Sequence, residues 1–184
     1  MRKFFGVIFV AVVTFGCAKV ALAEPSSAIR SLTGVTAVRV VVEDFNAAMQ
    51  QTGLKKEQLY ALAHEALSKN GIRMLEPHDI GWVPLVYIRL SSVMGGEGDG
   101  APVGLYLNMQ VRQMAVLEKK GETPAKHPIA LMEEKPFLVS TWENGTIAMV
   151  GRREIGFYVR TILTNLVGDF AHDHKEANGA QPQS

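Results

Sequence analysis

The chain has 184 residues, with 19 Lys and Arg against 18 Asp and Glu, and its formal net charge is +1. This near-neutral balance argues against a dedicated nucleic-acid binder, because such proteins normally present a basic face. The length fits one domain, which at this size buries about 70% of its unfolded surface and needs no disulfides to hold its core.

The first 23 residues have the composition of a signal peptide. Arg2 and Lys3 precede an apolar run over 4–15, and small residues before position 24 predict cleavage between Ala23 and Glu24. The run is shorter than the ~20 residues that a membrane-spanning helix needs. The chain that remains has 16 basic and 18 acidic residues, a formal charge of −2, and no expected transmembrane helix. We therefore expect an exported protein in the periplasm or on the periplasm-facing envelope.

The one cysteine of the sequence lies inside this signal. Loss of Cys17 with the signal excludes disulfides, thiolate catalysis and thiolate metal ligands. Because Cys17 follows Gly16, a second interpretation is lipidation, which would make the protein an outer-membrane lipoprotein. Phe15 and Thr14 do not match the small and Leu-like residues that usually precede a lipidated cysteine, so we favour loss of the thiol with the signal.

The segments after the signal predict a lead-in, a domain and a tail. Residues 24–33 are mostly polar and are expected to form a flexible lead-in to a single domain over 34–178. The residues 179–184 are expected to be a disordered tail. Within the domain, the β-branched run at 35–42 predicts the first strand, and 44–53 is expected to be a polar connector.

A helix is predicted next, followed by a short strand. The residues that share one stripe at helical spacing are Leu59, Leu62, Ala63, Ala66 and Leu67. Asn70 and Gly71 end this helix, since glycine accepts the left-handed backbone of a C-terminal cap. Residues 72–75 then predict a short strand.

Two longer strands are expected at 83–94 and 105–117, joined by a glycine-rich loop at 95–100. They should pair as an antiparallel hairpin with one buried and one wet face. The second strand alternates clearly, with Leu107, Met109 and Val111 on the apolar face and Asn108, Gln110 and Arg112 on the polar face. The first strand places Tyr87 and Arg89 on the same polar face.

The last third of the chain predicts a loop, a strand and the longest helix. Residues 119–128 are expected to be a loop, 137–142 a strand, and 143–145 a turn. The helix over 151–178 has an apolar face made of Ile155, Val159, Ile162, Leu163, Leu166, Val167 and Phe170.

The order β-α-β-β-β-β-α predicts an α+β fold. We expect a mostly antiparallel twisted sheet of four to five strands, with two helices packed on one face. The other face of the sheet would then be open to solvent or to a partner.

Two sets of residues are candidates for binding another protein. Phe157 is predicted to be exposed beside Arg152 and Arg153, and aromatic residues and arginine are enriched at interfaces. The second set is Asn108, Gln110 and Arg112 on the open face of the sheet. For both sets the alternative is a solvated surface.

A candidate divalent-metal site lies on the last helix. Asp169, His172, Asp173 and Glu176 have i, i+3, i+4, i+7 spacing, which stacks them along one side of a helix. Imidazole with carboxylate oxygens suits zinc, nickel or copper. The alternative is a solvated helix end that extends beyond the core.

No local pattern predicts catalysis or a cofactor. The pair His64-Glu65 lacks the second histidine of the zincin motif, because position 68 is Ser68. The 95–100 loop is not followed by the Lys-Ser/Thr pair of a phosphate loop, and no Ser-His-Asp or Cys-His arrangement is indicated by spacing. We predict no catalytic residue and no cofactor.

Four segments resemble a group of small exported bacterial α+β proteins to which no function is assigned. They are GLKKEQLYALAHEALSKNGIRML (53–75), YLNMQVRQMAVL (106–117), STWENG (140–145) and VRTILTNLVGDFAHDHKEAN (159–178). The resemblance implies a Gram-negative, periplasm-facing setting and carries over no functional residue.

The leading hypothesis for function is a non-catalytic periplasmic or envelope-associated adaptor that binds another envelope protein. The alternative is a periplasmic protein that binds a small ligand or a divalent metal, and the third hypothesis is an enzyme of unknown class. Nucleic acid is not an expected partner.

Overall fold

The computed structural model describes residues 26–76, 79, 82–96, 98, 101–115 and 136–179. The predicted signal peptide with Cys17, the 119–128 loop and nearly all of the predicted tail lie outside the described residues. The strands are β1 (Arg39–Val42), β2 (Leu85–Met94), β3 (Pro102–Ala115) and β4 (Phe137–Gly151). The helices are α1 (Ser27–Arg30), α2 (Ala47–Gln50), α3 (Lys56–Lys69) and α4 (Ile155–Gly179), with a 3₁₀ turn, η2, at Arg152–Glu154.

The fold is α+β, as predicted, and it is built on one four-stranded sheet with the order β1-β2-β3-β4. The pairs β2–β3 and β3–β4 are antiparallel, whereas β1 and β2 run parallel. The sheet is therefore mixed. The parallel pair arises because α3 returns the chain to the end of the sheet from which β1 started, and such a crossover can only join parallel strands.

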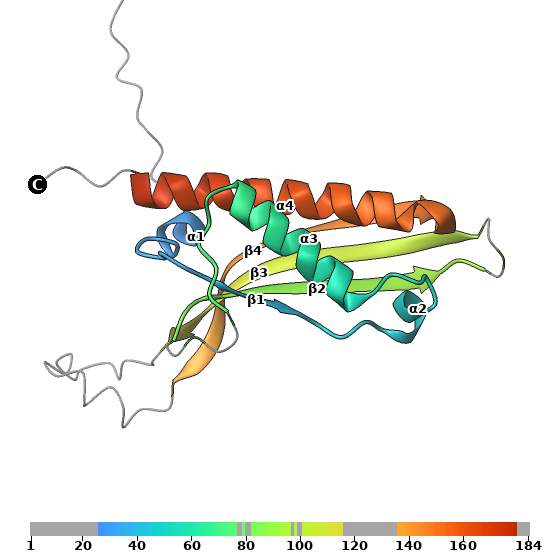
Figure 1. The fold of residues 1–184 in the computed structure, drawn as a ribbon, viewed down its shortest axis with the longest axis horizontal. Coiled ribbons are helices and arrows are strands. Elements are labelled where there is room, and N and C mark those ends of the chain that lie inside the picture. The colour runs from blue at the N-terminus through green and yellow to red at the C-terminus, as the bar shows by residue number, and fades with distance from the viewer. Residues whose placement is uncertain are drawn as a thin grey trace, which may run out of the picture.

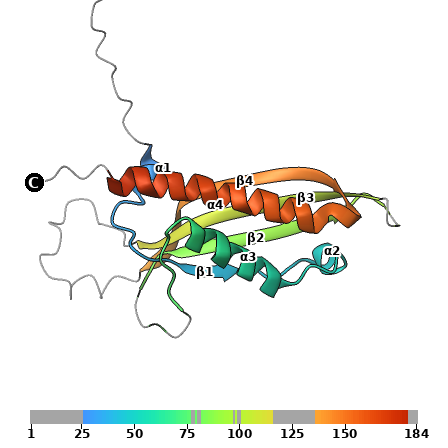
Figure 2. The same cartoon turned by 45° about the horizontal axis from the view of Figure 1, so that its top comes forward.

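Both long helices cover the same face of the sheet, with α3 over β1 and α4 over β3 and β4 (Figures 1 and 2). The core lies between these two layers. All seven residues expected on the apolar face of the last helix are buried. In α3 the expected stripe is buried except for Leu62, which is half-buried, and Gly71 follows the helix with a φ of 75°. The amphipathic pattern of the sequence therefore predicted correctly which side of each helix is buried.

The prediction of a turn at 143–145 is wrong, because β4 runs without interruption through these residues. Asn144 pairs with Met109, and Gly145 pairs with Asn108. Asn-Gly favours turns locally, but here the long strand β3 supplies a template along its whole length. The hydrogen bonds of this ladder outweigh the local preference of two residues.

The predicted strand at 72–75 is reduced to a single bridge between Val38 and Met74. Val38 donates its N–H to the Arg73 carbonyl and accepts a hydrogen bond from the Leu75 N–H. Among the described residues the ladder goes no further than this bridge. The sheet consequently has four strands, and the expected order of five strands is wrong at this point.

Two segments expected to be irregular contribute to the folded domain. The 44–53 connector contains α2, where the Asn46 side chain accepts a hydrogen bond from the Met49 N–H and Met49 is fully buried. The 24–33 segment contains α1 and the fully buried Leu32. The folded core therefore includes a residue before position 34, because Leu32 belongs to the same buried cluster as the side chains of α4 and the sheet. Within the described ranges, no helix combines the length and the apolar character needed to cross a bilayer.

Candidate functional site: the open face and the edge of the sheet

No described element packs on the sheet face opposite α3 and α4, and we call this the open face (Figures 1 and 2). Arg39 and Val41 of β1 lie on this face beside Leu85 and Tyr87 of β2. Its other side chains come from alternate positions of β2, β3 and β4. They are Tyr87, Arg89, Ser91 and Val93 on β2, Gly104, Tyr106, Asn108, Gln110 and Arg112 on β3, and Glu143, Gly145, Ile147 and Met149 on β4. The expected position of Asn108, Gln110 and Arg112 on this face, beside Tyr87 and Arg89, is confirmed.

One half of the open face is polar, and its charged groups are engaged with one another. The Arg112 guanidinium lies 3.6 Å from the centre of the Tyr87 ring and donates two hydrogen bonds to the Gln110 side chain, at 2.9 and 2.8 Å. Arg89 forms an ion pair with Glu43. The hydrogen bond from Arg89 holds the pKa of the Glu43 carboxyl below its usual value, and Tyr87 adds a smaller effect in the same direction. Both arginines are therefore held by neighbouring side chains, and Arg89 is also neutralised by Glu43.

Asn108 is buried although its side chain belongs to the polar half. Its amide donates to Glu143 at 2.9 Å and to the Asn144 carbonyl at 3.3 Å. A Cβ atom at Gly145 would lie 3.1 Å from the Asn108 amide nitrogen and 3.2 Å from the Leu107 carbonyl oxygen. The glycine therefore leaves the space that Asn108 fills, and Asn108 is a structural residue of β3 and β4.

The other half of the open face is apolar and strongly exposed. Val93 is 73% exposed, Ile147 77% and Met149 69%. They lie in two neighbouring rows of the sheet, in which Gly104 separates Val93 from Met149 and Tyr106 lies beside Ile147. We call Val93, Tyr106, Ile147 and Met149 the apolar end. Because no row of this end contains a charged residue, it differs chemically from the polar half.

The second predicted set, Phe157 with Arg152 and Arg153, lies away from the first. Phe157 is 68% exposed, as expected, and its ring packs edge-on against Tyr158 with 5.5 Å between centroids. Arg152 donates to the Gln51 carbonyl at 3.0 Å. These residues belong to η2 and the start of α4, on the helical side of the sheet. The structure therefore divides the predicted partner-binding residues between two surfaces.

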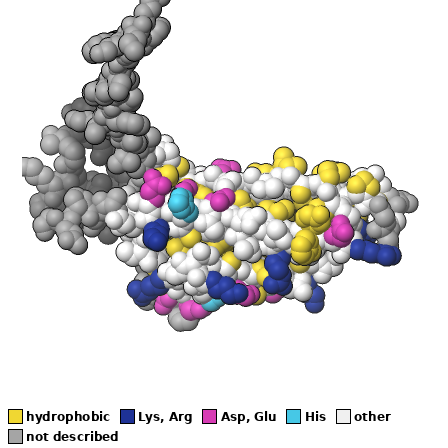
Figure 3. Space-filling view, turned by 90° about the horizontal axis from the view of Figure 1, so that it is seen from above, with side chains coloured by type: hydrophobic (Ala, Val, Ile, Leu, Met, Phe, Trp, Pro, Cys, Tyr) yellow, Lys and Arg dark blue, Asp and Glu magenta, His cyan; other side chains and the backbone are white. Residues whose placement is uncertain are grey.

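A shallow groove of about 570 Å³ separates the first turns of α3 and α4. Apolar side chains of Leu54, Leu62 and Phe157 line it together with Arg160. Seen from the side of α4, hydrophobic side chains gather toward this end, whereas acidic and histidine side chains lie toward the other end (Figure 3). The two ends of the helical face thus have different chemistry.

The candidate metal ligands on α4 are divided by the contacts that hold the helix on the sheet. Asp169 accepts a hydrogen bond from the Asn144 amide at 2.9 Å, and Asp173 accepts one from the Trp142 indole at 2.8 Å. The potential ligand atoms of His172, Asp173 and Glu176 lie within 4.8 Å of one another. Asp169 does not join this group. The two aspartates have a structural role, since each fixes a β4 side chain against α4.

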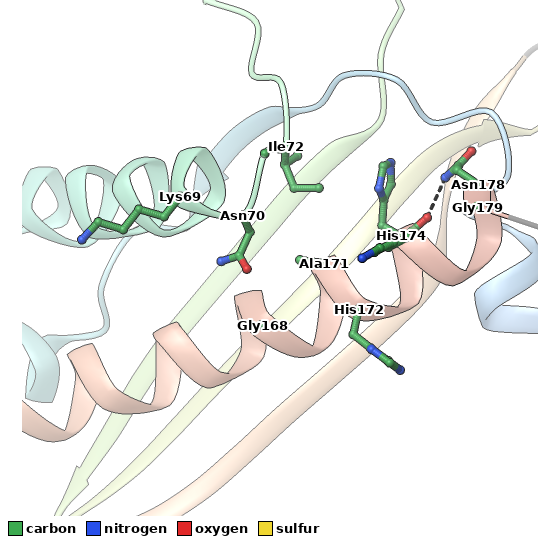
Figure 4. Close-up of a pocket in the computed structure, with 11 residues that line it drawn as sticks. Lys69, Asn70, Ile72, Gly168, Ala171, His172, His174, Asn178 and Gly179 are labelled. Atoms are coloured by element: carbon green, nitrogen blue, oxygen red, sulfur yellow. Dashed lines mark hydrogen bonds between the residues drawn. The ribbon is translucent and has the colours of Figure 1, made fainter.

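A hollow of about 860 Å³ lies between the end of α3 and the last turns of α4 (Figure 4). The Nε2 atom of His174 lies 2.6 Å from the Val35 carbonyl oxygen, and Asn178 donates to the His174 carbonyl. The ring of His172 points to the other side of α4 (Figure 4). The polar groups of His174 and Asn178 therefore anchor the segment after α1 to α4. Their hydrogen bonds are made within the protein, and they do not converge on a ligand site.

The residues missed from the sequence are Ile147 and Met149. The sequence predicted a turn at 143–145 and no strand after it. The alternation of Ile147 and Met149 with Thr146 and Ala148 was therefore not recognised as the two faces of a strand. The exposure of Val93 could have been found, since Tyr87, Arg89, Ser91 and Val93 alternate with buried residues. These three residues make up most of the apolar end.

No protein-family model and no curated protein matches the chain. One similar solved structure is a minor lipoprotein from Acinetobacter baumannii, with 12% sequence identity and a TM-score of 0.35. The match covers 82% of this chain and 99% of that one. A TM-score of this size supports neither a shared fold nor a shared function. The resemblance to a group of small exported proteins stays a prediction.

Proposed function

We propose that this chain is an exported, non-catalytic domain that binds another protein of the cell envelope through the apolar end of its open face. The observation that carries the proposal is the exposure of Val93, Ile147 and Met149, each more than two-thirds accessible and all in two neighbouring rows on one face of the sheet. Contiguous exposed apolar surface on a folded domain typically marks an interaction site. Burial of such surface contributes about 25 cal/mol per Å².

The chemistry of the face favours the apolar end over the polar half. Arg89 and Arg112 already interact with Glu43, Tyr87 and Gln110, so a partner would have to break these contacts to use the charges. Binding at the apolar end does not require a partner to break such contacts. Its partner is expected to present an uncharged, apolar surface, and the interaction is expected to depend little on salt.

The shape of the face favours a protein over a small molecule. Small-molecule sites are concave and enclose most of the ligand, whereas Val93, Ile147 and Met149 project from a sheet surface. Pairing of β3 with β2 and β4 fixes the positions of these side chains relative to one another. An exposed apolar surface of this kind is well suited to docking against a second folded surface.

The exported setting is supported by the order of charged, apolar and small residues in positions 1–23. Intact-mass spectrometry of the protein from its source cells tests this part separately. A mature chain that starts at Glu24 is expected. A full-length chain that retains its first 23 residues would contradict export by this route, and an acylated start at Cys17 would identify a lipoprotein.

Site-specific photo-crosslinking tests the binding surface. A photoreactive phenylalanine analogue at Val93 is expected to capture a discrete envelope protein in the source cells. The matched control is the same analogue at Thr164, which is exposed on α4 on the opposite side of the molecule. Failure of the Val93 position to yield a product, or the same product from Thr164, would contradict the proposal. The substitution Met149→Lys is expected to weaken capture from Val93 without unfolding the domain.

A further inference from the structure

The outer edge of β4 is the second unusual feature of this sheet. β4 is the last strand of the order β1-β2-β3-β4, so one of its sides has no strand beside it. At its beginning, the Ser31 hydroxyl donates to the Thr141 carbonyl at 3.0 Å, and α1 lies against the strand there. Within the described ranges, no element forms a ladder with the stretch from 143 to 151.

The hydrogen-bond pattern identifies the backbone groups that point away from the sheet. The Gly95 N–H donates to the Pro102 carbonyl, so the even-numbered residues of β3 in this part of the strand bond to β2 and the odd-numbered ones bond to β4. The register then directs the N–H and C=O groups of odd-numbered β4 residues outward. In agreement, the outward N–H of Gly145 donates to the Asn144 side chain at 2.8 Å. Ile147 and Met149 present the next outward groups.

Among the described residues, none of the usual protection against another strand is found at this edge. The sequence from 144 to 151 is NGTIAMVG, with no charged residue and no proline. Natural edge strands are commonly blocked by lysine, proline, a bulge or a covering segment. The bulge of β4 lies at the other end of the strand, beside Val111 and Arg112. The stretch around Ile147 is therefore an uncharged edge with apolar side chains, and its outward backbone groups have no ladder partner among the described residues.

We propose that this edge pairs with the same edge of a second copy of the chain, antiparallel across a two-fold axis. A register that sets Ile147 opposite Met149 does so twice, because of the symmetry, and joins the two sheets into one of eight strands. Cross-strand apolar pairs of this kind stabilise antiparallel sheets. The same register sets Gly145 opposite Gly151.

Charge complementarity favours a second copy in this register. No like charges meet, because the paired stretch has none. Beyond the stretch, Glu143 precedes the paired residues, and the turn η2 with Arg152, Arg153 and Glu154 follows them. The antiparallel arrangement therefore brings the acidic side chain of one copy toward the turn with two arginines of the other. A two-fold arrangement uses each of these contacts twice, and self-complementary contacts of this kind are typical of symmetric dimers.

The dimer goes beyond the proposed function, because it uses the edge of the sheet, whereas envelope-protein docking uses its face. Edge pairing brings the two apolar ends side by side on a continuous surface. The two proposals can be separated experimentally at Val93. This residue lies on the open face but on β2, two strands away from the edge.

Sedimentation velocity of the purified protein tests the dimer, with two matched lysine substitutions. The unsubstituted chain is expected to sediment as a dimer at micromolar concentrations. Ile147→Lys is expected to sediment as a monomer with unchanged circular dichroism, since the side chain is exposed and only the edge is altered. Val93 has a similar exposure, 73% against 77% for Ile147, so Val93→Lys introduces the same charge at a comparable position, and this variant is expected to remain dimeric. A monomeric unsubstituted chain, or a dimeric Ile147→Lys, would overturn the proposal.

Engineered cysteines test the register. In a Cys17→Ser background, an equimolar mixture of Ile147→Cys and Met149→Cys chains is expected to form a disulfide under mild oxidation, because opposite residues of a ladder have Cα atoms about 5.5 Å apart. Each variant alone is expected to form much less, since like positions are offset by two residues. Equal cross-linking in all three samples, or none in the mixture, would exclude this register.

Discussion

Trp142 and Asp173 join the middle of β4 to the last turns of α4, and their contact predicts a measurable coupling. The indole of Trp142 is buried, packs edge-on against Phe170 with 5.4 Å between centroids, and donates to Asp173 at 2.8 Å. Replacement by phenylalanine keeps an aromatic ring in the core but removes the donor. Replacement by alanine removes the ring as well.

The expected losses follow from these contacts. A hydrogen bond to a charged acceptor contributes about 1.5–3 kcal/mol when it is buried. Asp173 is only partly buried, so water can replace part of the bond, and we expect a coupling of about 1 kcal/mol. Trp142→Phe is expected to cost about 2 kcal/mol in total, because a smaller ring also leaves unfilled volume. Trp142→Ala is expected to cost about 3–5 kcal/mol.

Urea unfolding followed by far-ultraviolet circular dichroism measures these free energies. A double-mutant cycle of Trp142→Phe with Asp173→Ala isolates the hydrogen bond from the packing of the ring. A coupling within a few tenths of a kcal/mol of zero would refute the inference that Asp173 positions the indole. A loss below about 1 kcal/mol for Trp142→Ala would refute the burial of this side chain.

Three further predictions concern other parts of the fold. Glu43 has a pKa below its ordinary value of 4.5 in the folded state, so its pair with Arg89 stabilises the fold above that pH and loses its contribution as the pH falls through the lower folded value. Because both side chains are about a third or more exposed, Arg89→Ala should reduce the stability difference between pH 7 and pH 3 by only about 0.5 kcal/mol, measured by urea unfolding at the two pH values. Gly145→Ala should destabilise by about 1 kcal/mol, because its Cβ atom would meet a carbonyl oxygen of β3 at 3.2 Å. The matched change Gly104→Ala, where the nearest atom is a flexible methionine sulfur at 3.5 Å, should be neutral or stabilising, and equal losses at the two glycines in thermal unfolding would contradict this reasoning. Leu32→Ala should cost about 2–5 kcal/mol, since this side chain is fully buried, whereas a loss near zero would support the prediction that residues 24–33 are only a flexible lead-in.

The parts of the fold that the sequence predicted well are those in which one periodic pattern extends over many residues. The apolar face of α4 was predicted residue by residue, and the alternation of β3 placed Asn108, Gln110 and Arg112 on the open face. The α+β class followed from the order of these elements. In such segments, burial of one face determines the structure, and that face is visible in the spacing of the side chains.

The candidate site was predicted less well, because its residues depend on a strand whose local signals are contradictory. Asn144 and Gly145 favour a turn by themselves, yet β3 pairs with β4 through both residues, and the continued strand places Ile147 and Met149 beside Val93. The burial of Leu32 likewise depends on a contact with elements more than one hundred residues away.

The sequence alone determined the amphipathic elements, their order, the α+β class and the features that predict export. The tertiary structure decided that β1 and β2 run parallel, that β4 continues past its glycine, and that apolar side chains remain on an open face and an uncovered edge. These outcomes depend on which strands become neighbours. Pairing between strands is set by contacts that are distant in the sequence, and no local pattern records them.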